Sequence, residues 1–67
     1  MSKETPTDVA FNLRFRAAVQ DQNARSATSE AMRQHHSKTA KILRVQADLI
    51  DQGVPIERVM RSQSGAN

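Results

Sequence analysis

The sequence contains no cysteine, tryptophan or tyrosine, and only two glycines and two prolines in 67 residues. Without cysteine the chain has no disulfides, and it offers no cluster of metal-ligand residues, so we expect no metal and no cofactor. A domain of about 60 residues hides only ~60% of the surface that its unfolded chain exposes. Association is the remaining route to stability for so small a chain, and we therefore expect a homodimer.

Long hydrophobic runs are also missing. No stretch approaches the ~18 apolar residues of a membrane span. The polar segment 1–6 is followed by Asn12, Arg14 and Arg16, which interrupt the only candidate for the apolar region of a secretory signal. We expect a soluble, cytoplasmic protein with no membrane partner, and the lack of cysteine fits a reducing compartment.

Residues that could carry catalysis are scattered along the chain. Gly53 and Gly65 are the only glycines, so a glycine-rich phosphate loop cannot be built. His35 and His36 are adjacent, and on a helix they point about 100° apart, unlike an i, i+4 pair that binds one metal ion. We place His35 at the edge of an apolar face and His36 near solvent. We expect no enzyme activity and no small-molecule substrate.

The spacing of the apolar residues predicts an all-α protein, either a small helical bundle or a helical hairpin. The clearest helix start is the segment 5–8, where Thr5 can cap the helix, Pro6 suits its first position and Asp8 can complete a capping box. We predict a helix that begins at Pro6 and a break near residues 23–26.

The continuation of this first helix fits two periods. On a helix its apolar residues fall on two nearly opposite faces, with Phe11, Phe15, Ala18 and Val19 on one and Val9, Leu13, Ala17 and Ala24 on the other. Such a helix needs neighbours on two faces. Residues 9–17 also alternate between apolar and polar as in a half-buried strand, so a short N-terminal strand remains open as the alternative.

The best-supported element is a helix from about Ser29 to Gln52. Its apolar stripe, at three- and four-residue steps, consists of Ala31, Met32, His35, Thr39, Ile42, Leu43, Gln46, Leu49 and Ile50. Gly53 predicts a left-handed cap, and Pro55 then opens a short helix that ends near Arg61. These elements make a single helical domain over 6–61, with a flexible N-terminus over 1–5 and a flexible tail over 62–67.

Positive charge is concentrated in the second helix, where residues 31–47 include no acid. The cations of this span are Arg33, Lys38, Lys41 and Arg44. All but Lys38 project away from the apolar stripe and form a basic ridge that could follow a phosphate backbone. An ordinary solvated face is the alternative, because Asp48 and Asp51 lie at the same angle one to two turns further on.

Two segments together resemble the ribbon-helix-helix repressors of the Arc type: Phe-Asn-Leu-Arg-Phe at 11–15 and Asn-Ala-Arg-Ser-Ala-Thr-Ser-Glu at 23–30. The resemblance implies a strand at 11–15 that pairs with its dimer mate and reads bases in the major groove. Asn12 and Arg14 would then contact bases, while Phe11, Leu13 and Phe15 would face away from the groove. The backbone amides of residues 26–29 would meet a phosphate.

Two functions fit these patterns best, with a self-assembling structural module as a third. The first is a dimeric, transcriptional-regulator-like protein that binds nucleic acid, above all DNA. Its contact residues would be Asn12, Arg14, Arg16, Arg25, Arg33, Lys38, Lys41 and Arg44. The second is a small adaptor or inhibitor that docks an amphipathic helix onto another protein, anchored by Phe11 and Phe15. Its interface would also include Leu13, Ile42 and Leu49.

Overall fold

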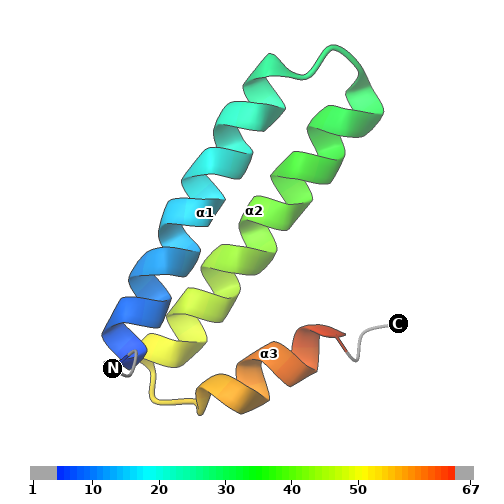
Figure 1. Ribbon diagram of the computed structural model, residues 1–67. Coiled ribbons are helices and arrows are strands. Elements are labelled where there is room, and N and C mark those ends of the chain that lie inside the picture. Colours follow the sequence, from blue (N-terminus) through cyan, green and yellow to red (C-terminus); the bar gives the residue numbers. More distant parts are fainter. Residues whose placement is uncertain (1–4, 65–67) are drawn as a thin grey trace.

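The computed structural model describes residues 5–64, with side chains as far as Arg61. Within this range α1 covers Pro6–Ser26, α2 covers Glu30–Asp51 and α3 covers Ile56–Ser64. The first two helices lie antiparallel and side by side as a hairpin, and α3 follows from the end of α2 at an angle to both, leading away from α1 (Figure 1). The expected all-α class, in the form of a helical hairpin, is therefore confirmed for the described residues, whereas the expected dimer stays a prediction.

The strand alternative for residues 9–17 is wrong, because the whole segment lies in α1. Its start is fixed by the predicted capping box. The Asp8 backbone N–H donates to Thr5 Oγ1 at 3.1 Å, and the Thr5 backbone N–H donates to Asp8 Oδ2 at 3.4 Å. With Pro6 at the first helical position, this cap satisfies amides that would otherwise lack partners.

The break between the two long helices falls at residues 27–29, slightly later than predicted. Ser29 is the residue that decides it, since its side-chain oxygen accepts a hydrogen bond from the Met32 backbone N–H at 3.2 Å. Ala24, in the last turn of α1, is buried, so packing keeps the helix intact through the predicted break. The predicted span of α2 is confirmed at both ends.

The end of α2 is the predicted left-handed cap. Gly53 has a φ of +100°, and its N–H donates to the Ile50 carbonyl at 3.0 Å. The Val54 N–H donates to the Leu49 carbonyl at 3.0 Å, which completes a Schellman motif. Leu49 and Val54 are both partly buried against the core, as is usual for this cap.

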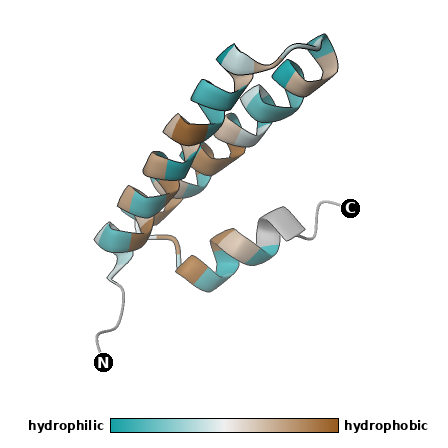
Figure 2. Cartoon of the chain, turned by 45° about the horizontal axis from the view of Figure 1, so that its top comes forward, coloured by the Kyte–Doolittle hydropathy of each residue, from teal (hydrophilic) through white to brown (hydrophobic). Residues whose placement is uncertain are grey.

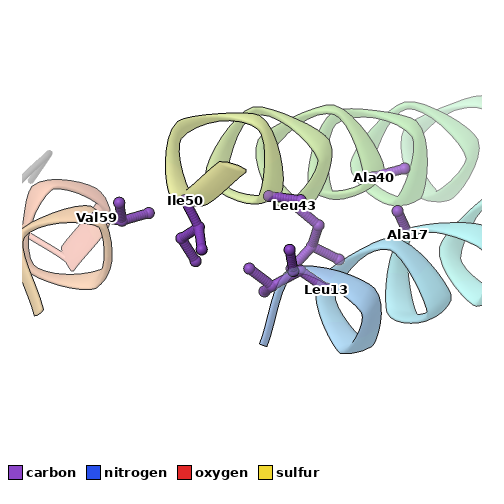
Figure 3. Close-up of a cluster of buried hydrophobic side chains, with 8 residues drawn as sticks. Leu13, Ala17, Ala40, Leu43, Ile50 and Val59 are labelled. Atoms are coloured by element: carbon purple, nitrogen blue, oxygen red, sulfur yellow. The ribbon is translucent and has the colours of Figure 1, made fainter. Parts of the chain in front are cut away.

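Alanine dominates the seam between α1 and α2. The buried residues are Ala10, Leu13, Ala17 and Ala24 of α1 together with Ala40, Leu43, Gln46, Ala47 and Ile50 of α2. The alanines recur every seven residues in each helix, and such small side chains let two helix axes approach closely. Figure 3 shows Leu13 beside Leu43 and Ala17 facing Ala40, while Figure 2 shows hydrophobic segments recurring along both helices.

The third helix packs on the hairpin near the end of α2. Its Val59 is buried and points toward Ile50 of α2 (Figure 3). Val54, Ile56 and Met60 pack around the same end. The helix continues to Ser64, beyond the predicted end near Arg61, so residues 62–64 of the expected tail are helical. Residues 1–4 and 65–67, where flexible ends were predicted, lie outside the described residues.

The apolar stripe predicted for α2 is rotated relative to the observed one. Ala31 and His35 are exposed, because α2 turns Ala40 and Ala47 toward α1. Met32, in the first turn of α2, is 50% exposed as well. The placement of the histidines is therefore reversed. His36 is the half-buried one, with its Nδ1 2.7 Å from Oε1 of Gln20 in α1, whereas His35 is exposed.

Candidate interaction surface

Ion pairs join the two long helices of the hairpin. Arg14 of α1 places its Nη2 2.8 Å from Asp51 Oδ2 and 2.9 Å from Asp48 Oδ1, both on α2. Its ion pairs with Asp51 and Asp48 raise the pKa of Arg14. Arg14, which we expected to contact nucleic acid, thus joins the two helices of the hairpin.

A second interhelical ion pair lies two turns of α1 further along. Arg44 donates to a carboxylate oxygen of Asp21. This hydrogen bond is the main reason that the pKa of Asp21 is lowered and that of Arg44 is raised. One cation of the basic ridge predicted for α2 is therefore paired with an acid of α1.

The third paired arginine lies at the loop end of α2. Arg33 Nη1 is 2.9 Å from Glu30 Oε1, one turn earlier in the same helix, and Arg33 Nη2 donates to the Ala27 carbonyl at 3.5 Å. With Arg14 and Arg44, this makes three of the seven predicted nucleic-acid-binding cations partners of intrachain carboxylates.

The other four cations, Arg16, Arg25, Lys38 and Lys41, are exposed and form no ion pair within the described part of the chain. Arg16 and Arg25 are nine residues apart, which is about two and a half helical turns, so they lie on opposite sides of α1. Lys38 and Lys41 are close neighbours on α2. The structure does not gather the predicted cations, or the exposed Asn12, on one face.

The most apolar exposed surface is the side of α1 that faces away from α2. Phe11 is 71% exposed, Phe15 61% and Val19 42%, and Ala18 between them is exposed too. We call Phe11, Phe15, Ala18 and Val19 the outer stripe. It follows the three- and four-residue steps of a helix-packing surface. Phe11 and Phe15 were predicted as protein anchors, and both are available to a partner.

The rest of the predicted protein interface does not belong to this surface. Leu13 is 2% exposed in the hairpin core, so its assignment as an interface residue is wrong. Ile42 and Leu49 are half-buried on α2, and Leu49 packs against the core. Two further apolar side chains of α2 are exposed. Met32 was predicted in the apolar stripe of this helix, whereas Val45 lies outside that stripe.

Other kinds of site find no support in the part of the chain that is described. No three His, Asp or Glu residues there come together as a candidate metal site. None of the described helices has the length and apolar character needed to cross a membrane. Comparison of the chain with protein-family models, with curated proteins and with solved structures finds no match.

Proposed function

We propose that this chain is a non-catalytic protein-interaction module, in which the hairpin is a scaffold that presents the outer stripe of α1 to an apolar protein surface. One observation carries this proposal. The two aromatic side chains, Phe11 and Phe15, are largely exposed, while five of the nine buried hydrophobic residues in the described part are alanines.

The physical reason is the cost of leaving aromatic area in water. A phenylalanine that becomes buried removes up to roughly 200 Å² of surface, so the exposed parts of Phe11 and Phe15 together represent about 250 Å². At ~25 cal/mol per Å² their burial is worth about 6 kcal/mol before ordering costs. Rigid aromatic anchors on a preformed helix are also typical of the residues that dominate protein interfaces.

A second candidate is the nucleic-acid-binding regulator. It is supported by the formal net charge of +3 and by Arg16, Arg25, Lys38 and Lys41, which are exposed and form no ion pair among the described residues. Each cation that neutralises a phosphate releases counterions and adds to the salt dependence of binding. Arg14, Arg33 and Arg44 would first have to leave their carboxylates. Protein docking is favoured because the outer stripe needs no such rearrangement.

Photo-cross-linking can test the proposed function. A photoreactive phenylalanine analogue is placed at Ala18, in the outer stripe, or at the exposed Ser37, on the side of α2 that carries Arg44. We expect discrete protein adducts from position 18 and none from position 37, and we expect Phe15→Ser to remove the adducts. Adducts from position 37 alone, or none at all, would overturn the proposal.

The second candidate is tested by fluorescence anisotropy with random duplex DNA and RNA across a salt series. A regulator of this kind should bind at low salt, and Lys38→Gln combined with Lys41→Gln should weaken binding while Phe15→Ser should not. The opposite response of these two variants would favour protein docking. Together the two experiments assign the function to one surface or the other.

A further inference from the structure

We infer that the surface covering the outer stripe is a second copy of this chain, packed antiparallel so that two α1 helices form the centre of a four-helix bundle. This inference rests on the proposed function, because it names the partner of the same face. Four observations support it: the spacing of the stripe, the sizes of its residues, the charges at its ends and the small size of the hairpin core.

The spacing of the outer face repeats that of the inner seam. The exposed residues Phe11, Phe15, Ala18 and Gln22 follow one another along α1 in steps of four, three and four residues. Alternating three- and four-residue steps are the pattern of a seam between two helices that cross at a shallow angle. The inner seam of α1, in which Leu13 and Ala17 pack on α2, is built on the same steps. Each α1 is therefore suited to pack between two helices.

The sizes of these residues fit an antiparallel pair in one register. In this register, the numbers of two residues that lie opposite each other add up to 33. Phe15 of one copy then lies opposite Ala18 of the other, and Phe11 lies opposite Gln22. An aromatic ring then meets a small or flexible side chain at each level, as in interdigitated helix packing. The same register repeats both pairs by two-fold symmetry, as a closed dimer requires.

The charges at the two ends point to the same arrangement. Asp8 borders the stripe near the start of α1, and Arg25 borders it in the last turn. Their numbers also add up to 33, so the antiparallel register brings the acidic end of one helix level with the basic end of the other. It also sets opposite ends of the helix dipoles side by side. A parallel pair would instead place the two Asp8 side chains, the two Arg25 side chains and the equal ends of the helix dipoles side by side.

The area available sets the strength of this dimer. The two phenylalanines and their neighbours offer roughly 400 Å² per copy, or about 800 Å² in total, which is below the 1,200–2,000 Å² of a standard stable interface. We therefore expect a dimer that dissociates in the micromolar range. The thin, alanine-rich core of each hairpin would gain stability from this association, as small chains without disulfides commonly do.

Sedimentation equilibrium over a concentration series tests the dimer with the full chain. We expect the apparent mass of the wild type to rise with concentration from 7.5 kDa toward twice that value. Phe15→Glu should weaken association by about 30-fold or more, as loss of a central anchor does. Ser37→Glu, the same change at another exposed helix position, should leave it unchanged. Circular dichroism of both variants checks that they remain helical.

Single cysteines test the register, because the chain has no cysteine of its own. In the antiparallel pair, the two copies of residue 18 lie about 6 Å apart, within disulfide range, whereas the two copies of residue 22 are offset by about 16 Å along the helix. Oxidation should link Ala18→Cys into a covalent dimer and leave Gln22→Cys monomeric. Linkage of both variants would indicate a parallel pair and overturn the inference.

Failure of this inference is distinguishable from failure of the proposed function. A wild type that stays monomeric at every concentration, while position 18 cross-links to a different protein, overturns the second copy as the partner and keeps the interaction module. A monomer that gives no adduct at position 18 overturns both. A dimer that persists in Phe15→Glu places the contact elsewhere and also overturns the inference.

Discussion

Phe15 and Ala17 lie two residues apart on α1 and face opposite sides of it: Phe15 is 61% exposed, while Ala17 is completely buried against α2. A two-residue step rotates a helix by about 200°, so neighbouring apolar residues can serve different surfaces. The hairpin thus closes over an alanine-rich seam and leaves both phenylalanines outside. This choice is explained by close approach of the two helices, which alanine permits and phenylalanine does not.

The alanine seam should be intolerant of larger side chains. We predict that Ala17→Leu lowers the free energy of unfolding by about 1–3 kcal/mol, because the added carbon atoms force the helices apart. The matched control is Ala31→Leu at an exposed position of α2, which should change it by less than about 0.5 kcal/mol. Urea unfolding followed by circular dichroism measures both. Equal effects would contradict a close-packed seam.

The start of α2 should depend on the Ser29 side chain. Ser29→Ala removes the acceptor for the Met32 N–H, and we expect a loss of about 1 kcal/mol. For a domain of this size the melting temperature should fall by roughly 4–8 °C. Ser37→Ala, in the middle of the same helix and exposed, should instead be neutral or slightly stabilising. Thermal unfolding that fails to separate these two variants would rule out the cap.

The turn between α2 and α3 should require glycine at position 53. No atom of the described residues lies within 4 Å of a Cβ added there, so the effect of Gly53→Ala isolates the backbone conformation. We expect a loss of about 1–2 kcal/mol from the left-handed φ. Gln52→Ala, one residue earlier in ordinary helical geometry, should cost less than about 0.5 kcal/mol. If thermal unfolding shows that Gly53→Ala is as stable as the wild type, the left-handed cap is contradicted.

The ion pair between Asp21 and Arg44 should make part of the stability depend on pH. Because Arg44 lowers the pKa of Asp21 in the folded state, the contribution is present above the ordinary carboxylate pKa and is lost as the pH falls below about 4. The stability advantage of the wild type over Asp21→Asn should shrink over that range.

NMR titration of the Asp21 carboxylate measures this directly. Arg44→Met should raise its pKa toward the ordinary value. Lys41→Met, which removes an exposed cation one turn earlier that forms no ion pair in the described part, should leave it low. If both variants shift the pKa of Asp21 equally, general positive charge rather than this pair would be the cause.

The start of α1 and the end of α2 were predictable because the contacts that fix them are local. The Thr5–Asp8 box joins residues three apart, and the cap at Gly53 joins residues at most five apart. Such contacts are recognisable from residue type and spacing alone. The strand alternative was wrong because it rested only on the apolar–polar alternation of residues 9–17. The capping box just before these residues starts a helix that includes them.

The candidate site was predicted only in part. Phe11 and Phe15 were recognised as one face of α1, but two apolar faces of similar length left open which one the chain would bury. The pairing of Arg14 with Asp48 was missed, because it joins residues 34 positions apart. A charge pattern read along one helix cannot include acids contributed by another.

The sequence by itself determined that this chain is helical, where α1 begins, where α2 begins and ends, and that α1 has two apolar faces. Only the tertiary structure decided which face is inside. Packing selected the alanine seam, because helices approach most closely over small side chains, and the same packing brought Arg14 and Arg44 to their carboxylates. The outer stripe is what remains, since a two-helix hairpin can cover only one face of α1.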